Sequence, residues 1–327
     1  MPNMRLKITF FTCILIFTYQ INVTKQFGNE CPSPEDIYPC ECERRHGDKT
    51  YLVCKELFVS RDLEIALKAS QKVDLYGLSI QDSTIQYLPS DEFDGTLFEE
   101  FELKNTGLTA ITDGEHAFKG LEDRLKYIEI RDCRFLNSWS WKAFSKINSL
   151  RLLQFIGGDL RTLSSDFSIL SRNKMLATVN MNLNEIRSLD KHVFSQFPML
   201  LDIYLQGNKI ETIERSMFPN PAQLSFMNFA SNKISRLPDD VFSNMPRLRI
   251  VLLYDNQLTT LSEVTFKPIW NQLIQISLEN NDIICDCRLI WIVDNQGGPR
   301  KVEGNCKRPD FLEGRTLTSL NERDLHC

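Results

Sequence analysis

Cysteine is the residue type in this 327-residue chain with the most specific chemistry, and its spacing limits what that chemistry can be. Eight of the ten cysteines form two clusters, one near each end of the chain: Cys31, Cys40, Cys42 and Cys54, and Cys285, Cys287, Cys306 and Cys327. In an exported chain, four cysteines at each end favour two disulfide-bonded caps. A zinc site is the alternative, but both clusters contain C-x-C pairs instead of the C-x2-C pairs typical of zinc ligands. We therefore expect disulfides, no metal and no other cofactor.

The N-terminus has the pattern of a secretory signal. Arg5 and Lys7 precede an apolar stretch at residues 8–19, which is too short to span a bilayer. We expect residues 1–24 to be a signal peptide and the remainder to be secreted and extracellular, without a membrane span. A retained signal anchor is the alternative.

The chain between the cysteine clusters is an internal repeat. The pattern L-x-x-L-x-L-x-x-N-x-L, with other apolar residues allowed at the Leu places, occurs nine times within residues 73–284. Its ninth positions are 23 to 27 residues apart and are occupied by Ser83, Thr106, Cys133, Gly158, Asn184, Asn208, Asn232, Asn256 and Asn281. A phenylalanine also recurs once in eight of the repeats: Phe93, Phe118, Phe144, Phe167, Phe194, Phe218, Phe242 and Phe266.

This period and consensus are those of leucine-rich repeats, in which each copy supplies one short strand and a return loop. A single copy cannot bury its apolar edge, so neighbours stack into one continuous core. The prediction is an α/β solenoid, a leucine-rich-repeat horseshoe with short parallel strands on the concave face. The recurrent phenylalanines are expected to stack inside its convex side.

The ninth position must satisfy backbone groups where the chain turns after each strand. An unpaired buried group costs about 1–3 kcal/mol, and an Asn side chain offers both donors and an acceptor. Asn184, Asn208, Asn232, Asn256 and Asn281 are therefore expected to form a structural ladder. Cys133 occupies the same position, so we expect a buried, reduced thiol, with an intermolecular disulfide as the alternative.

The ends of the chain carry a family resemblance. The C-terminus contains C-D-C-x-L-x-W at residues 285–291, C-x-x-P at 306–309 and L-x-G-x-x-L at 312–317. With the repeats, these motifs resemble extracellular leucine-rich-repeat proteins with cysteine-rich caps, here at 25–72 and 285–327. The resemblance implies the bonds Cys285–Cys306 and Cys287–Cys327, and, by the same order, Cys31–Cys42 and Cys40–Cys54.

A narrower resemblance lies in the first cap. The segment C-P-S-P-E-D-I-x-P-C-x-C, which begins at Cys31, is similar to a group of secreted arthropod proteins. That group resembles the non-catalytic leucine-rich subunit of a deep-sea shrimp luciferase. The resemblance implies a hetero-oligomer with a catalytic subunit as one candidate assembly.

The residues needed for catalysis are dispersed. The four histidines, His46, His116, His192 and His326, fall in the first cap, in two distant repeats and in the last cap. Because a solenoid holds such positions apart, they cannot form a catalytic triad or a metal cluster. We therefore expect a protein that is not an enzyme. The formal net charge of −5, without a basic run, also argues against a nucleic-acid partner.

A protein partner is expected on the concave face. The third, fifth and seventh positions of each repeat face outward, and in repeats six to eight they include Tyr204, Phe226, Ile250, Leu252 and Tyr254. Apolar residues at such places have no role in the core, and a contiguous exposed patch marks an interface. The alternative is that these are scattered surface residues of the ordinary kind.

The opposite end of the concave face is charged. Glu100, Glu102 and Glu129 lie on adjacent predicted strands, flanked by Lys104 and Arg131. Glu102 and Glu129 are expected directly opposite each other, a mildly unfavourable pair. We expect the flanking cations to relieve this repulsion and the whole group to be a solvated face; a bound cationic ligand is the alternative.

The function predicted from the sequence is that of a secreted, non-catalytic protein-binding scaffold. The alternatives are a stabilising subunit of a secreted enzyme complex of the luciferase type and a structural protein of the extracellular matrix. The sole N-x-S/T sequon is at Asn22, close to the predicted signal peptide, which argues mildly against the matrix alternative.

Overall fold

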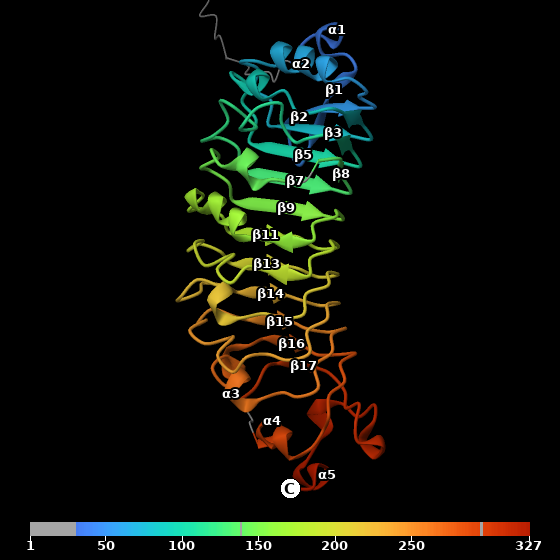
Figure 1. Cartoon of the computed structure of the whole chain (residues 1–327), viewed down its shortest axis with the longest axis vertical. Helices are drawn as coiled ribbons and strands as arrows, with labels where there is room; N and C mark the ends of the chain where they lie inside the picture. Colours follow the sequence, from blue (N-terminus) through green and yellow to red (C-terminus); the bar gives the residue numbers. More distant parts are fainter. Residues whose placement is uncertain (1–30, 138, 295–296) are drawn as a thin grey trace, which may run out of the picture.

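The computed structural model describes residues 31–137, 139–294 and 297–327. The predicted signal peptide and Asn22 lie outside the described residues. The remainder forms one long solenoid, in which successive strands are stacked like rungs from the N-terminal to the C-terminal cap (Figure 1).

The main sheet has twelve strands among the described residues, in the order β1-β2-β3-β5-β7-β9-β11-β13-β14-β15-β16-β17. The first four repeats supply five-residue strands: β3 (Gly77–Gln81), β5 (Glu100–Lys104), β7 (Tyr127–Arg131) and β9 (Leu152–Ile156). The other five supply three-residue strands: β11 (Thr178–Asn180), β13 (Asp202–Tyr204), β14 (Phe226–Asn228), β15 (Ile250–Leu252) and β16 (Gln275–Ser277). All of these strands are parallel and in register, since each repeat places its strand at the same point. The expected parallel sheet is confirmed.

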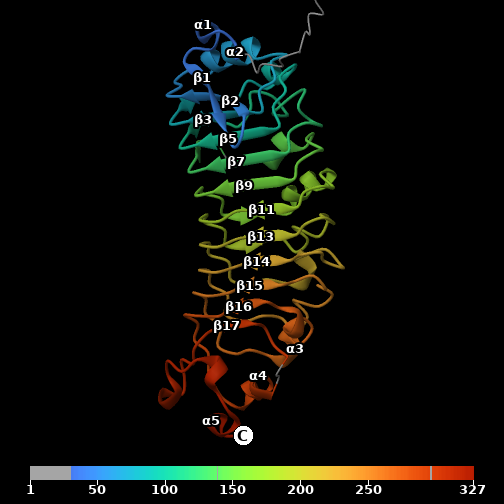
Figure 2. The same ribbon diagram turned by 180° about the vertical axis from the view of Figure 1, so that it is seen from behind.

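Each end of the sheet is closed by a cap. At the N-terminus, β1 (Cys40–Arg45) pairs antiparallel with β2 (Lys49–Lys55), which in turn pairs parallel with β3. The short helix α1 (Pro34–Ile37) and the longer α2 (Ser60–Ala69) cover that end, as Figure 2 shows from behind. At the C-terminus, β17 (Lys301–Glu303) extends the sheet, followed by α5 (Glu322–Leu325).

The four disulfides of the structure lie in these caps. They join Cys31 to Cys42, Cys40 to Cys54, Cys285 to Cys306 and Cys287 to Cys327. This is the pairing that the family resemblance implies. Each bond links segments that the repeats themselves do not hold, so the caps close the two exposed ends of the core.

The convex side is made of return loops with short elements. Its strands form two small sheets, one of β4 (Thr84–Ile85), β6 (Gly107–Leu108) and β8 (Arg134–Phe135), the other of β10 (Thr162–Leu163) and β12 (Ser188–Leu189). Its helices include α3 (Glu263–Phe266) and 3-10 turns at Ser90–Phe93, Trp141–Phe144, Ser165–Arg172, Arg215–Met217 and Trp270–Gln272, whereas α4 (Ile290–Asp294) belongs to the C-terminal cap.

The recurrent phenylalanines stack beneath these loops, as expected. All eight are buried. The Phe93 and Phe118 rings are 5.0 Å apart between centroids, and those of Phe167 and Phe194 are 5.9 Å apart. Between Phe144 and Phe167 the stack continues through Trp141, whose ring is 5.0 Å from that of Phe167. Repetition of one aromatic position therefore produces a continuous core along the solenoid.

The asparagines of repeats five to nine form a connected ladder. The Asn232 amide donates to the carbonyl oxygens of Leu205, Phe229 and Ala230 at 2.9–3.1 Å, and its oxygen accepts from the Ile210 amide at 3.0 Å. Consecutive asparagines share carbonyls: the Leu205 oxygen also accepts from Asn208. The repeats are thus joined to one another through side chains as well as through the sheet.

The ladder ends abruptly at repeat five. Gly158 has no side chain to continue it, and a Cβ there would lie 2.4 Å from the Phe155 ring and 3.0 Å from the Asn184 side-chain oxygen. That buried oxygen has no hydrogen-bond partner among the described residues. In the earlier repeats, Thr106 makes a single side-chain bond, to the Lys104 carbonyl. The N-terminal repeats therefore have fewer of these connections.

We accordingly expect the two halves to differ in local stability. In a solenoid, stability is close to a sum over neighbouring repeats, so residues 75–165 should open before 176–283. Amide hydrogen exchange should be slower in the second segment by roughly tenfold, equivalent to about 1.4 kcal/mol. Equal or greater protection in residues 75–165 would contradict the ladder's predicted contribution.

Candidate functional site

The predicted apolar patch lies on the concave face of repeats six to eight. The register places Phe226 of β14 beside Ile250 of β15, and Asn228 beside Leu252. The Tyr204 ring of β13 packs against that of Phe226, with centroids 4.7 Å apart and planes inclined by 31°. These residues and Tyr254 are half-buried and lie outside the core. We call Tyr204, Phe226, Ile250, Leu252 and Tyr254 the concave patch.

Polar pairs link the outward side chains of repeats four to seven. Asn180 donates to Gln154 at 3.1 Å across neighbouring strands. Ser225 donates to Asp202 at 2.9 Å, and Asn228 donates to Gln206 at 3.1 Å. Each contact joins consecutive repeats, because parallel strands about 4.8 Å apart bring their outward side chains within reach. Because Asn228 lies between Tyr204 and Leu252 in the sheet, these polar pairs alternate with the apolar side chains of the concave patch.

The charged N-terminal end of the face differs from expectation. Glu102 does lie opposite Glu129 in the sheet, but Glu102 is only 5% exposed. Its carboxylate accepts from Arg45 at 2.9 Å, Ser79 at 2.8 Å and Lys104 at 3.0 Å. The prediction of a solvated face was wrong here, because the first cap covers this carboxylate with Arg45.

The remaining members of that group are partly buried and paired. Glu129 accepts from Arg131 at 2.9 Å and from Gln154 at 3.2 Å. Lys104 and Arg131 therefore relieve the like-charge pair as predicted, and the sequence argument missed Arg45, which does so from another element. We call Arg45, Glu102, Lys104, Glu129 and Arg131 the charge cluster.

Electrostatics follow from this arrangement. Burial alone would raise the pKa of Glu102, but the hydrogen bonds from Lys104 and Ser79 and the charges of Lys104 and Arg45 hold it below its ordinary value. Burial raises the pKa of Glu100, although a hydrogen bond from Tyr51 opposes the shift. The pKa values of the neighbouring carboxylates Glu100 and Glu102 are thus shifted in opposite directions, because the two groups have different partners.

Tyr51 shows how the cap reaches over the first repeats. Its backbone lies beside Gly77, and its hydroxyl donates to Glu100 of the next strand at 2.9 Å. A Cβ on Gly77 would be 2.7 Å from the Tyr51 ring, so glycine is needed for the ring to cross β3. The Arg45 guanidinium lies 5.3 Å from the centre of the same ring.

The first cap therefore fills the concave face over the first strands. Tyr51, Ser79 and Glu102 occupy outward positions of the sheet and are all buried. The accessible part of the concave face begins further along, where the outward positions of β7, β9 and β11 become half-exposed. The concave patch belongs to this accessible part.

The sequence argument also missed a neighbour of the patch. Ile274 directly precedes β16, its backbone amide donates to the Arg249 carbonyl oxygen at 2.7 Å, and it is 44% exposed. It occupies the second position of its motif, whereas the sequence pattern predicted outward side chains at the third, fifth and seventh positions. The signal in the sequence is an apolar residue at this second position.

Cys133 is a free thiol and is buried in the structure. Its sulfur lies 3.2 Å from the Arg131 carbonyl oxygen and 3.4 Å from that of Leu103. Burial raises its pKa to about 11, and two backbone hydrogen bonds oppose that shift. The thiol therefore stays protonated and occupies the ninth motif position, where the later repeats have asparagine.

We expect Cys133 to be unreactive in the folded protein. With a pKa of about 11, roughly one thiol in a thousand is ionised at pH 8, and only thiolate is alkylated rapidly. Iodoacetamide should label Cys133 in denaturant but not in buffer, as measured by mass spectrometry of the non-reduced protein. Labelling in buffer, or a disulfide-linked dimer on a non-reducing gel, would contradict this prediction.

The histidines are separated as the repeats required. Nδ1 of His116 is 3.1 Å from the Ser145 hydroxyl, whereas Nδ1 of His192, three repeats further along the chain, is 3.2 Å from the Ser216 carbonyl oxygen. Within residues 31–137, 139–294 and 297–327, no group of three His, Cys, Asp or Glu side chains is placed to hold a metal ion. In those same segments no helix is long and apolar enough to cross a bilayer.

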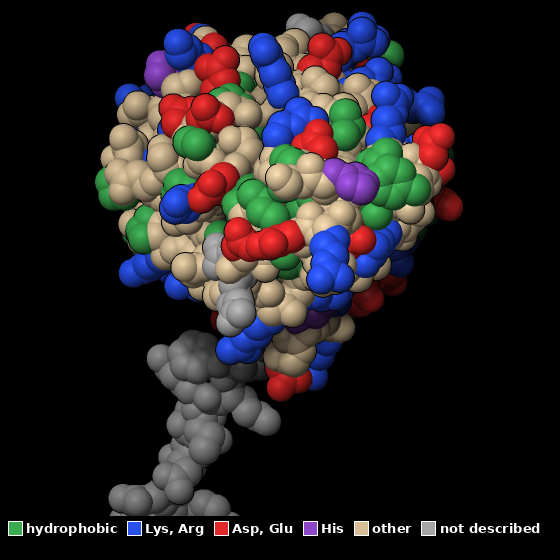
Figure 3. Space-filling view, turned by 90° about the horizontal axis from the view of Figure 1, so that it is seen from below, with side chains coloured by type: hydrophobic (Ala, Val, Ile, Leu, Met, Phe, Trp, Pro, Cys, Tyr) green, Lys and Arg blue, Asp and Glu red, His purple; other side chains and the backbone are tan. Residues whose placement is uncertain are grey.

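A second surface feature lies in the C-terminal cap. A hollow of about 940 Å³ is lined by residues that include Arg308, Phe311 and His326, and Phe311 is 65% exposed. Figure 3 shows acidic and basic side chains interspersed over this end of the molecule, with small apolar areas between them. Phe311 offers a comparison for the concave patch, because it is an exposed aromatic residue far along the chain from it.

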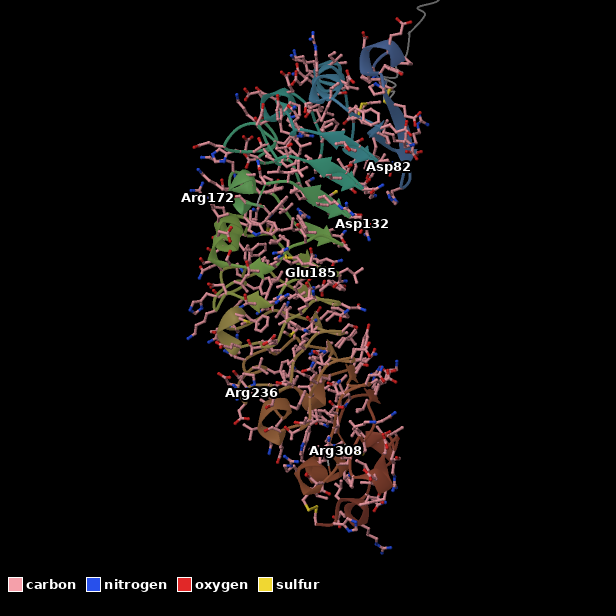
Figure 4. The ribbon with its side chains drawn as sticks, turned by 45° about the vertical axis from the view of Figure 1, so that its right-hand side comes forward. Asp82, Asp132, Arg172, Glu185, Arg236 and Arg308 are labelled. Carbon is pink, nitrogen blue, oxygen red and sulfur yellow. A yellow bond between two sulfur atoms is a disulfide. The ribbon has the colours of Figure 1, made fainter. Side chains whose placement is uncertain are left out.

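Figure 4 shows how the two long faces differ. Asp82 and Asp132 lie along the edge where the strands end, whereas Arg172 and Arg236 lie on the side of the return loops. Asp82 and Asp132 have left-handed backbones, as do Leu183 and Asp255 at the equivalent position of later repeats. This turn aligns the eighth positions of successive repeats along one border of the concave face.

Comparisons with known proteins agree with the fold. A leucine-rich-repeat family model matches residues 174–234 and 222–283, which cover the five asparagine-containing repeats. A chain from the octameric complex of Latrophilin 3, Unc5D and the leucine-rich-repeat protein FLRT2 superposes with a TM-score of 0.63 at 14% identity, covering 91% of this chain and 100% of that one. A chain of the Toll–Spatzle complex from Drosophila gives 0.55 at 15% identity, covering 83% of this chain and 47% of that one.

A curated relative is also similar over a short stretch. It is the Oplophorus-luciferin 2-monooxygenase non-catalytic subunit of Oplophorus gracilirostris, 34% identical over 67 residues. The match covers 20% of this chain and 18% of the relative. The chain thus has a leucine-rich-repeat fold with a cap at each end and local similarity to a non-catalytic subunit.

Proposed function

We propose that this leucine-rich-repeat chain is a secreted, non-catalytic scaffold that binds a protein partner on its concave patch. The observation that carries the proposal is the packing of Tyr204 on Phe226, continued by Ile250 on the next strand. These side chains lie outside the hydrophobic core, so their burial against each other does not complete the solenoid. Half-exposed aromatic and aliphatic residues gathered on one face are suited to anchoring a partner.

The location of the patch supports the same proposal. Over the first strands, the concave face is occupied by Tyr51 and the charge cluster. In repeats four to seven, several outward amides and hydroxyls bond to one another. The patch is where apolar side chains meet solvent on this face, and removing apolar area from water contributes about 25 cal/mol per Å².

The four disulfides support the proposal that the chain is secreted. Disulfides persist in oxidising compartments, and the eight cap cysteines are bonded in pairs. The boundaries proposed from the sequence, with caps at 25–72 and 285–327 around repeats at 73–284, describe the exported unit.

A second candidate function is favoured by the similarity to the non-catalytic luciferin 2-monooxygenase subunit. In that case the partner is a secreted enzyme that this chain stabilises as a hetero-oligomer. Size separation distinguishes the two candidates. A subunit copurifies with its enzyme at a fixed ratio, whereas a scaffold dissociates on dilution and is recovered alone. An extracellular-matrix role would instead leave the chain in the insoluble fraction.

The proposal is tested with the double variant Tyr204→Ala, Phe226→Ala. The partner is first recovered from the extracellular fluid of the source organism with the wild-type chain. Truncating central interface aromatics commonly costs 2 kcal/mol or more, so affinity should fall by about thirtyfold or more. Phe58→Ala is the matched control, because Phe58 is 74% exposed in the first cap.

Folding is checked separately by the amount secreted and the thermal midpoint. Both should stay near wild type in the double variant, since neither ring is part of the core. Unchanged affinity in the double variant would refute concave-patch binding. A loss of affinity in Phe58→Ala, or in Phe311→Ala, would place the interface on a cap.

A further inference from the structure

The concave patch has charged side chains of opposite sign at its two borders. Arg249 lies where β15 begins, while Asp255 and Glu279 follow β15 and β16. Asp255 is six positions after Arg249 in the sequence, which is at most about 20 Å of extended chain. A bound peptide would need complementary charges at its two ends, so an apolar strip with unlike charges at its borders favours one orientation of the peptide.

Arg249 lies at the border of the patch, directly before β15. In the preceding repeat, the side chain at the second position, Ser225, contacts Asp202 at the third position of its neighbour. Arg249 holds the equivalent second position one repeat later and directly precedes Ile250, which is the register partner of Phe226. Its guanidinium donates to the carbonyl oxygens of Pro246 and Leu248, at 3.3 and 3.1 Å. Among the residues that the structure describes, it makes no ion pair with a carboxylate.

The acidic border is likewise uncompensated. Asp255 accepts from the Asn280 amide at 2.7 Å and from the Ser231 hydroxyl at 3.2 Å, and both partners are neutral. Glu279 is exposed at the seventh position, beside Tyr254. Over the described segments, no lysine or arginine lies within ion-pair distance of either carboxylate. Two negative charges therefore remain where the patch ends.

Asp202 also lies near the basic border, two strands away from β15. Its carboxylate oxygens accept from Ser225 at 2.9 Å and from Thr178 at 3.4 Å. Its charge is directed toward these hydroxyls and toward Tyr204, whose pKa is raised by burial and by Asp202. The positive charge of this border is therefore that of Arg249, and Asp202 adds a negative charge two strands away.

We propose that the partner docks through an amphipathic segment with a defined charge order. Its apolar centre covers Phe226, Ile250 and Leu252, an acidic side chain meets Arg249, and a basic side chain meets Asp255 and Glu279. This inference rests on the proposed function. Complementary charges at an interface rim set orientation and association rate more than they add affinity.

The test uses four synthetic peptides with one shared apolar centre. Their termini carry Glu and Lys, two Glu, two Lys or two Gln, and binding to the secreted full-length chain is measured by calorimetry at low salt. The Glu/Lys peptide should bind roughly fivefold more tightly than each of the others, the ratio expected for about 1 kcal/mol of rim electrostatics.

Charge reversal supplies the decisive control. In the variant Asp255→Lys, Glu279→Lys, the two-Glu peptide should become the preferred ligand, and in Arg249→Glu the two-Lys peptide should. Phe226→Ala should weaken all four equally. Equal binding of the four peptides to wild type, no binding of any of them at millimolar concentration, or an unchanged order in the reversal variants would overturn the charge order.

Failure of this inference is distinguishable from failure of the proposed function. The double variant Tyr204→Ala, Phe226→Ala can weaken binding of the natural partner while Arg249→Glu and Glu279→Lys do not. In that case the patch binds the partner independently of the charges at its borders. If the aromatic variant leaves natural-partner binding unchanged, the patch itself is not the site.

Discussion

Replacing Asn232 with alanine is expected to destabilise the chain by at least about 3 kcal/mol. The buried side chain bonds to the backbones of three segments, and the Ile210 amide has no other hydrogen-bond partner among the described residues. Without the asparagine that N–H is left unpaired, and three carbonyl oxygens each lose a donor. Chemical denaturation of the secreted protein gives the free energy of unfolding directly.

Cys133→Ala is the matched control for Asn232→Ala. It occupies the equivalent position of the third repeat, but its thiol has one hydrogen to share between two carbonyls. We expect a loss of roughly 1 kcal/mol or less there. A loss in Asn232→Ala no larger than in Cys133→Ala would mean that the ladder does not stabilise the repeats as its geometry indicates.

Removing the Glu102 carboxylate is expected to give the second-largest effect. Breaking a buried ion pair from one side costs about 3–5 kcal/mol, and Arg45 and Lys104 retain some contact with water. We therefore expect Glu102→Ala to cost about 3 kcal/mol, the lower end of that range. Glu129→Ala is the control from the same cluster, and its more exposed carboxylate should contribute less.

The same carboxylate makes the N-terminal part sensitive to acid. The pKa of Glu102 is lower in the folded chain than its ordinary value, so the folded state binds fewer protons. The stability that it contributes is fully present above the ordinary carboxyl pKa and is lost as pH falls through the folded value. Between pH 5 and pH 3, wild type should therefore lose more stability than Glu102→Gln. An identical pH dependence would contradict the assignment.

Much of the architecture was predictable from the sequence because a solenoid is local. Each repeat contacts its neighbours, so the recurrent Leu, Asn and Phe positions indicate the strand, the turn after it and the core of the convex side in every repeat. The same regularity allowed the positions of Phe226 and Ile250 on adjacent strands to be predicted, and the register agrees. That these residues bind a partner stays a prediction.

The charge cluster was not predictable in the same way. Arg45 and Glu102 are 57 residues apart, and Arg45 belongs to a hairpin that has no counterpart in the repeat. Nothing in the period of the repeats specifies how far the cap reaches over the concave face. The break in the ladder was visible as Gly158 in the sequence, whereas the need for glycine there depends on the Phe155 ring.

Binding on the concave patch is tested most directly by photo-crosslinking. The photoreactive amino acid p-benzoylphenylalanine is placed at position 226 in one chain and at position 311 in another, and each is irradiated with the recovered partner. Binding on the concave patch predicts a covalent adduct from position 226 and none from position 311. An adduct from position 311 alone would contradict it and assign the interface to the C-terminal cap.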